Sequence, residues 1–207
     1  MRILVTGGSG VLGRSLSPLL AAEGHEVRAP RHEELDLFDS ERVAEAVQDA
    51  EAVYHLATRI PARERRGDPG AWLENDRLRA DASRLLVDAA LAGGTQVYVQ
   101  PSVTFLYRQD GEVWPHLESA LRAEREAARF ADADRMGVVL RFGTLDGPGT
   151  DHELPSQGAD ATIHVDDAGR ALLAALEASS GVYNVVRDGE RVSNARFKQA
   201  TGWRPCL

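Results

Sequence analysis

Short apolar runs and amphipathic stretches alternate along most of this chain. The apolar runs predict strands at residues 3–6, 26–29, 52–55, 96–99, 138–142 and 182–186. Between them, apolar side chains at helical spacing predict helices at residues 11–22, 40–48, 71–91, 117–131 and 166–178. Such an alternation, with strands that are continuous apolar runs, indicates a parallel sheet covered on both faces. The expected fold is a doubly wound α/β fold of the Rossmann type.

Two segments interrupt this alternation. Residues 59–70 are polar and rich in arginine and contain two prolines, so a surface loop is expected there. Residues 143–161 contain four glycines and two prolines and are expected to be irregular.

A glycine-rich turn follows the first predicted strand directly and opens the first predicted helix. Gly8, Gly10 and Gly13 fit the spacing G-x-G-x-x-G, and Gly7 begins a second, overlapping spacing. A turn without Cβ atoms can approach a pyrophosphate closely, and the helix then points unpaired N–H groups at the phosphates. The alternative, a turn that binds nothing, is disfavoured by the position between strand and helix. The predicted dinucleotide site comprises Gly7, Gly8, Ser9, Gly10, Val11, Leu12 and Gly13.

Composition and charge narrow the range of partners. The 207 residues carry a formal net charge of −8, which argues against nucleic acid as the main partner. No apolar run approaches the roughly 18 residues of a membrane span, so no membrane is expected either. Cys206 is the only cysteine, which excludes a disulfide framework and a cysteine metal site and is typical of a cytoplasmic protein. We expect no metal. Lys198 is the only lysine, so no earlier residue offers lysine chemistry.

Several motifs appear in an order that is characteristic of one family. They are residues 6–13 (T-G-G-S-G-V-L-G), 35–37 (L-D-L), 53–57 (V-Y-H-L-A), 100–102 (Q-P-S), 140–149 (L-R-F-G and G-P-G) and 163–171 (I-H-V-D-D-A-G-R-A). In these motifs the chain resembles the extended short-chain dehydrogenase/reductase superfamily, in its NAD-dependent epimerase/dehydratase family. The resemblance covers residues 2–205 and implies a Rossmann fold that binds NAD or NADP.

The resemblance also assigns roles to single residues. It implies that Asp36 and Leu37 meet the adenine, and that Leu56 and Ala57 lie beside the adenosine. Ser102, with Thr104 nearby, stands where the family carries its active-site serine, at the carboxyl end of the fourth strand. The alternative for Ser102 is a strand-end hydroxyl that hydrogen-bonds the backbone.

The residues after the second predicted strand bear on the choice of cofactor. NAD enzymes usually carry an acidic residue there for the ribose 2′-hydroxyl, whereas arginine accommodates a 2′-phosphate. Here no acidic residue lies between Val27 and Glu33, while Arg31 and Arg14 would bracket a 2′-phosphate. NADP is therefore favoured over NAD; the alternative is that Arg31 is only a surface residue.

Two features depart from the family pattern. The resemblance calls for a catalytic Tyr-x-x-x-Lys pair, but here Glu118 and Arg122 have the separation without the chemistry, because arginine does not titrate and a carboxylate is not a phenol. Tyr107 could replace the missing tyrosine as proton donor; the alternative is a packed aromatic side chain. In addition, few residues separate Pro148 from residues 163–171, so the substrate lobe is expected to be much reduced.

The remaining polar residues of the motifs are given structural roles. His55 and His164 are expected to be hydrogen-bonded within the fold rather than catalytic. Asp166 and Asp167 are expected to cap the helix that follows them and to interact with its dipole.

These observations predict a single domain over residues 1–207, with a Rossmann core at about 1–145 and a reduced C-terminal lobe at about 146–207. We expect an NAD(P)-binding oxidoreductase or epimerase-like enzyme with a degenerate catalytic site, acting on a small carbonyl or sugar substrate. The alternative is a non-enzymatic dinucleotide-binding sensor or regulatory subunit. The resemblance further implies a homodimer formed by the helices at 71–91 and 117–131.

Overall fold

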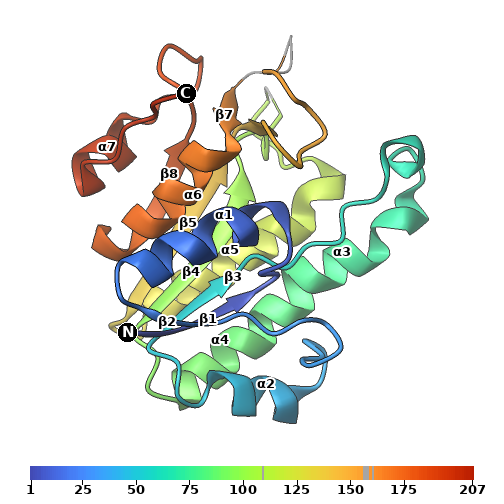
Figure 1. Ribbon diagram of the computed structural model, residues 1–207. Coiled ribbons are helices and arrows are strands. Elements are labelled where there is room, and N and C mark those ends of the chain that lie inside the picture. Colours follow the sequence, from blue (N-terminus) through green and yellow to red (C-terminus); the bar gives the residue numbers. More distant parts are fainter. Residues whose placement is uncertain (109, 156–158, 160) are drawn as a thin grey trace.

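The protein is built on a six-stranded parallel sheet, as the alternating pattern predicts (Figure 1). The computed structural model describes residues 1–108, 110–155, 159 and 161–207. The strands lie in the order β2-β1-β3-β4-β5-β8. Their bounds are β1 Arg2–Thr6, β2 Glu26–Arg28, β3 Ala52–His55, β4 Val97–Val103, β5 Met136–Phe142 and β8 Gly181–Val185. All five pairings in this sheet are parallel, which confirms the doubly wound fold.

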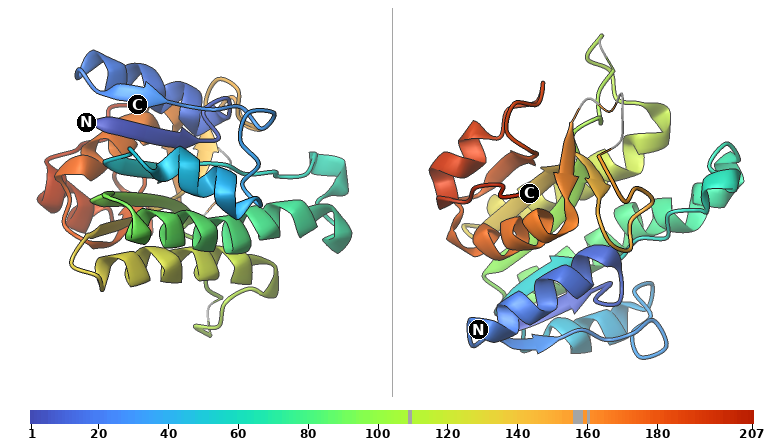
Figure 2. Two further views of the ribbon diagram at one scale, coloured as in Figure 1. Left: turned by 90° about the horizontal axis from the view of Figure 1, so that it is seen from below. Right: turned by 45° about the horizontal axis from the view of Figure 1, so that its top comes forward.

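Helices cover both faces of the sheet (Figure 2). On one face, α1 (Val11–Ala22) and α6 (Val165–Ala174) pack their apolar side chains against β1, β3, β4, β5 and β8. On the other face lie α2 (Ser40–Val47), α4 (Ser83–Ala92) and α5 (Glu118–Ala131). The two apolar clusters share no buried residue, because successive side chains along each strand point to opposite faces.

The order of the strands singles out one edge of the sheet. The chain runs from β1 outward to β2 and then returns across β1 to β3, so the direction of winding reverses at β1. In doubly wound sheets, ligands bind at the carboxyl ends of the strands where this reversal occurs. The carboxyl ends of β1 and β3 are therefore the place to look for a site.

The segment predicted as one helix at residues 71–91 is divided in the structure. A 3-10 turn (Pro69–Trp72), capped by the Asp68 side chain on the Gly70 amide, leads into α3 (Leu73–Arg77). A π-helical turn (Leu78–Ala82) then joins α3 to α4. Apolar spacing alone does not reveal such a turn, because it adds one residue without breaking the helix.

Other boundaries also differ from the sequence expectation. Strand β4 continues to Val103, beyond its apolar run, because Gln100 and Ser102 are polar but buried. The stretch expected to be irregular contains β6 (Thr144–Asp146), which pairs with β7 (Thr162–His164); residues 156–158 and 160 of that stretch lie outside the described part of the chain. Near the end of the chain, α7 (Ala195–Thr201) was not predicted.

The last forty residues pack on the same core as the first helix. Phe197 and Trp203 join the apolar cluster of α1 and α6, and β8 completes the sheet beside β5. The buried Asp167 carboxylate accepts hydrogen bonds from the backbone amides of Cys206 (3.0 Å) and Leu207 (2.9 Å). The division into a core and a reduced lobe stays a prediction. Within the described residues, no helix is long and apolar enough to cross a membrane.

Candidate functional site

The glycine turn lies at the carboxyl end of β1, and close packing requires glycine at three of its positions. Gly7 has a φ of +73°, and a Cβ there would lie 2.6 Å from backbone atoms of Ala57. A Cβ at Gly8 would lie 2.6 Å from that of Ala29, and a Cβ at Gly13 would lie 2.5 Å from the Gly8 Cα. The turn is thus tight against the segment after β3 and against its own helix.

The start of α1 offers free donors and no negative charge. The residue before the helix is Gly10, so no side chain caps the first amides, and the first turn contains no acidic residue. The Arg14 guanidinium donates a 2.5 Å hydrogen bond to the Ser9 carbonyl, which keeps its charge beside the turn. Backbone N–H groups, a helix dipole and a cation therefore point to the same place, which is the arrangement that binds a phosphate.

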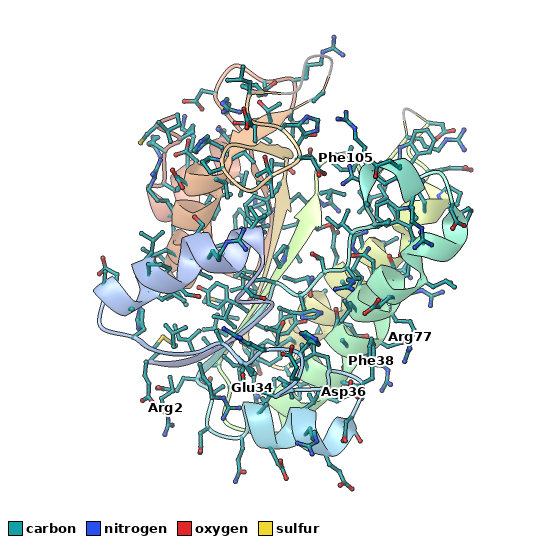
Figure 3. All side chains as sticks on the ribbon, turned by 45° about the vertical axis from the view of Figure 1, so that its right-hand side comes forward. Arg2, Glu34, Asp36, Phe38, Arg77 and Phe105 are labelled. Carbon is teal, nitrogen blue, oxygen red and sulfur yellow. The ribbon has the colours of Figure 1, made fainter. Side chains whose placement is uncertain are left out.

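The loop expected to hold the adenine packs against α3. The exposed Asp36 carboxylate accepts a hydrogen bond from the Phe38 amide (2.9 Å). The Arg77 guanidinium lies 4.1 Å from the centre of the Phe38 ring, and Figure 3 shows Asp36, Phe38 and Arg77 close together. Leu37 is half-buried beside these residues.

The turn after β2 contains an arginine and a glutamate that interact. Arg31 is exposed, and its backbone amide donates to the Glu34 carboxylate (2.8 Å). A group bound beside Arg31 would thus meet a positive and a negative side chain in one turn.

A buried histidine holds the carboxyl end of β3 in place through hydrogen bonds. His55 is fully buried; its Nδ1 accepts from the Thr6 hydroxyl (2.8 Å) and its Nε2 donates to the Leu78 carbonyl (2.9 Å). Burial lowers the pKa of His55 to about 4, so the ring is neutral. This is the structural role predicted for it. Leu56 and Ala57 follow directly and touch the glycine turn.

Ser102 lies at the end of β4 with its side chain toward α5. It is 7% exposed, and among the residues that the structure describes its hydroxyl has no hydrogen-bond partner. The alternative expectation, a hydroxyl that satisfies the backbone, is therefore not what the geometry shows. A buried hydroxyl without a partner at the carboxyl edge of a parallel sheet is suited to bind a ligand. Thr104 follows the strand, half-buried, and its amide donates to the Phe142 carbonyl (3.0 Å).

Tyr107 is 42% exposed and lies against an arginine instead of in an apolar core. The Arg141 guanidinium is 5.1 Å from the centre of the Tyr107 ring and donates to its hydroxyl at 3.4 Å. Glu124 of α5, itself buried, holds Arg141 through hydrogen bonds of 2.8 and 2.5 Å, and these bonds raise the pKa of Arg141. Arg141 and Ser102 are partners in the β4–β5 register. No functional role was predicted for Arg141 or Glu124 from the sequence.

The start of α5 contributes no titrating pair to this site. Glu118 and Arg122 are exposed and line an outer groove between α3 and α5. Ser119 is buried instead, and its hydroxyl donates to Asp76 (2.6 Å). Ala120 packs with Leu106 and Leu117.

At the start of α6, one of the predicted roles has to be corrected. The capping side chain is His164, whose Nδ1 accepts from the Asp166 amide (3.2 Å). Asp166 and Asp167 lie in the first turn, where they still interact with the helix dipole, but Asp167 is buried and anchors the end of the chain. Within the described part of the chain, no group of three or more His, Cys, Asp or Glu side chains could hold a metal ion.

Known proteins are similar to this chain in sequence and in fold. The model of a family described as NAD dependent epimerase/dehydratase matches residues 3–158. A Streptomyces protein named 3-diazoavenalumate denitrifying reductase is 35% identical, over 91% of this chain and 76% of its own length.

Two solved structures share the fold. RMD from Pseudomonas aeruginosa complexed with NADPH is 20% identical, with a TM-score of 0.77 over 100% of this chain and 95% of the other. A UDP-glucuronic acid 4-epimerase from Bacillus cereus, in complex with UDP-glucuronic acid and NAD, is 16% identical, with a TM-score of 0.80 and the same coverage. At these identities the likeness concerns the fold alone.

Proposed function

Because the chain belongs to the NAD-dependent epimerase/dehydratase family, we propose that it is an NAD(P)H-dependent oxidoreductase that acts on a small carbonyl compound. One observation carries this proposal. The tight glycine turn and the uncapped, acid-free start of α1 lie at the carboxyl edge of the sheet, where the winding reverses at β1. The reductase name of the Streptomyces relative favours an oxidoreductase within the family.

The proposed cofactor site lies at the carboxyl ends of β1 and β3 and in the loop after β2. The pyrophosphate lies on Gly7, Gly8, Ser9, Gly10, Val11, Leu12 and Gly13, with the charge of Arg14 beside it. Asp36 and Leu37 contact the adenine, and Leu56 and Ala57 flank the adenosine. When bound, the reduced nicotinamide supplies a hydride.

We propose NADP as the preferred cofactor, with Arg31 and Arg14 near the 2′-phosphate. Arginine suits a phosphate because its planar fork donates two hydrogen bonds along with its charge. The Glu34 carboxylate lies in the same turn as Arg31 and opposes this preference. The preference for NADP therefore depends on the Arg31 side chain turning toward the ribose.

The catalytic groups proposed are Ser102, Tyr107 and Thr104, with Arg141 as a positioning residue. Ser102 has a free hydroxyl and donates to the substrate carbonyl oxygen, on which negative charge develops. The Tyr107 hydroxyl then donates the proton that this oxygen takes up. Arg141 stabilises the phenolate that remains, because Glu124 holds its positive charge against the ring. Thr104 follows the end of β4 and borders the proposed substrate site beside Ser102.

Two further expectations stay predictions: a homodimer and a cytoplasmic location. The outer face of α5, which would contribute to a dimer, carries Arg122, Arg125 and Arg129. Arg129 is paired with Asp88 of α4 (2.7 Å).

Turnover of reduced cofactor tests the proposed function. We expect the protein to oxidise NADPH in the presence of some member of a panel of aldehydes, ketones and sugar nucleotides. Ser102→Ala should lower kcat by about 10²–10³, the usual effect of removing one donor to a developing oxyanion. Ser40→Ala, an exposed serine at the start of α2, is the control and should leave the rate unchanged. Tight cofactor binding without any turnover would overturn the proposal and support a dinucleotide sensor instead.

A further inference from the structure

Three residues that the proposed function leaves unused form one row on the helical segment beside β3 and β4. Asn75, Arg79 and Ser83 recur every fourth residue through α3, the π-helical turn and the start of α4. Asn75 and Ser83 are fully buried, Asn75 against the segment that follows β3 and Ser83 against Gln100 of β4. The Asn75 carboxamide oxygen accepts from the Arg59 amide (3.1 Å). The Ser83 hydroxyl donates to the backbone carbonyl of Arg79 and also lies 3.3 Å from the Gln100 carboxamide oxygen of β4. Arg79, between them in the row, lies on the same face.

The side chains of this row leave two buried donors without partners. Among the described residues, neither Nδ2 of Asn75 nor Nη1 of Arg79 makes a hydrogen bond, and the same holds for the Ser102 hydroxyl. Such orphaned groups are rare in folded proteins and call for an explanation. Two of these atoms can only donate, so a ligand that satisfies them must present acceptor oxygens.

Arg79 also differs from the other arginines that are buried near the sheet. Arg141 and Arg187 are each held by the two oxygens of one carboxylate, Glu124 and Asp146 respectively. No carboxylate in the described ranges forms an ion pair with Arg79. Burial lowers the pKa of its guanidinium, and the nearby charge of Asp76 only partly opposes this. The Asp76 carboxylate is itself engaged by the Ser119 hydroxyl (2.6 Å).

The π-helical turn is a second sign of function at this place. It spans Leu78–Ala82 and therefore contains Arg79. Single π-helical turns within α-helices occur frequently at functional sites. Leu78, at the start of the turn, is fixed through its carbonyl to His55 of β3 (2.9 Å), so the turn is tied to the strand that ends beside the glycine turn.

We propose that Arg79 and Asn75 bind a carboxylate of the substrate, and that this anchor places the reacting carbonyl on Ser102. The inference rests on the proposed function, because it assumes that substrate enters the pocket at the end of β4. A carboxylate fits better than a phosphate. Its planar oxygens match the guanidinium fork, and its single charge balances one arginine. Asp76 repels any anion, but it repels a phosphate dianion more strongly than a carboxylate with a single charge.

Calorimetry tests this proposal without turnover, by measuring how small carboxylates and aldehydes bind to the protein saturated with NADP⁺. The probes are acetate, benzoate, 4-formylbenzoate, the methyl ester of 4-formylbenzoate and 4-formylphenyl phosphate. We expect 4-formylbenzoate to bind more tightly than its ester and than the phosphate. Arg79→Gln should lower the affinity for the carboxylate by about 10- to 100-fold, which is the loss expected for one charge-assisted hydrogen bond. The affinity for the ester should not change.

Two more variants make the result interpretable. Arg79→Lys keeps the charge but not the fork, and should bind the carboxylate with intermediate affinity. Arg84→Gln removes an exposed arginine of α4, paired with Asp88 (3.1 Å), and should bind every probe as the wild type does. The unfolding temperature of each variant is measured alongside.

The possible failures are distinguishable. The inference is wrong if the wild type binds NADP⁺ but none of the carboxylates, if Arg79→Gln weakens ester and carboxylate equally, or if the phosphate binds best. Failure to bind either NADP⁺ or NAD⁺ would instead overturn the proposed function.

Discussion

At the scale of single residues, the proposed chemistry depends on Ser102, Tyr107 and Arg141. Ser102 and Arg141 lie side by side in the β4–β5 register, and Arg141 is in contact with the Tyr107 ring and hydroxyl. The pair expected from the family resemblance has a lysine four residues after the catalytic tyrosine, whereas here we propose that an arginine supplies the positive charge. Arginine keeps its charge at all working pH values, so it can stabilise a phenolate without itself exchanging a proton.

Replacing Tyr107 by phenylalanine tests this assignment. The ring of Tyr107→Phe would still stack on Arg141, while the proton donor is lost, so we expect kcat to fall by about 10²–10⁴ with little change in NADPH affinity. Steady-state kinetics measures both quantities. Tyr183→Phe is the control, because the Tyr183 hydroxyl donates to the Ser179 carbonyl in the segment just before β8, away from the site. A Tyr107→Phe enzyme with the wild-type kcat would exclude Tyr107 as the donor.

At the scale of elements, helix α5 and strand β5 are joined by a buried ion pair. Glu124 is 6% exposed and the side chain of Arg141 is 19% exposed, so neither charge is well solvated without the other. The pair thereby holds the arginine under Tyr107 and fixes α5 on the sheet. A second pair on the same helix, Glu126 with Arg129, is more exposed (side chains 20% and 40%).

The two pairs allow a matched comparison of stability. Glu124→Gln leaves Arg141 without its counter-charge and should lower the free energy of unfolding by roughly 3 kcal/mol, as for a broken buried pair. Glu126→Gln disrupts a surface pair and should lower it by at most about 1 kcal/mol. Urea unfolding of the two variants measures the difference. Equal effects would mean that burial of the Glu124–Arg141 pair contributes nothing to the stability of this layer.

The elements also show what the sequence can and cannot predict. The alternation of apolar runs and amphipathic stretches was sufficient for the fold class, because burial on both faces makes parallel strands continuously apolar. The end of β4 was missed because Gln100 and Ser102 are polar, and hydropathy does not distinguish a buried polar residue from an exposed one. The π-helical turn of Leu78–Ala82 has no apolar period of its own.

The same limit applies to the candidate site. The glycine turn and Ser102 stand in local motifs and could be found by reading along the chain. The Glu124–Arg141 pair joins residues that are 17 positions apart and meets only when α5 packs on β5. Arg79 has no sequence signal at all, because in a chain with a single lysine nearly every basic position is arginine. Only its burial without a partner distinguishes it.

At the scale of the whole molecule, the two faces of the sheet differ in polarity. The face under α1 and α6 carries a large apolar cluster, and the buried polar side chains near it belong to segments after β5: Asp146, Thr162, Asp167 and Asn194. The other face has apolar packing toward α2, α4 and α5, but buried polar groups gather at its carboxyl edge. These include Thr6, His55, Asn75, Ser83, Gln100, Ser102, Ser119 and Glu124. The cluster under α1 and α6 is thus the larger apolar one, while buried polar groups of the other face lie where β1, β3 and β4 end.

The buried histidine makes the stability of the whole molecule depend on pH. Burial lowers the pKa of His55 from 6.5 to about 4, so below pH 6.5 the unfolded chain binds a proton that the folded chain does not yet bind. The contribution of His55 to stability is therefore complete above pH 6.5 and declines by up to roughly 3 kcal/mol as the pH falls to about 4.

Urea unfolding of the wild type and of His55→Gln across this range measures the effect. The variant cannot take up the proton, so its stability should decline less steeply with falling pH than that of the wild type. Parallel curves for the two proteins would show that His55 is not buried in the neutral form.

Equilibrium titration with NADPH and NADH tests most directly whether the carboxyl ends of β1 and β3 bind a nicotinamide dinucleotide. We predict that both bind, NADPH more tightly. Gly13→Ala should lower the affinity for NADPH by at least about 10-fold, because the added Cβ would lie 2.5 Å from the Gly8 Cα within the phosphate turn. Gly94→Ala, where a Cβ meets nothing within 4 Å, should bind as the wild type does. A folded wild-type protein that binds neither dinucleotide, or a Gly13→Ala variant that binds NADPH as tightly as the wild type, would contradict the account.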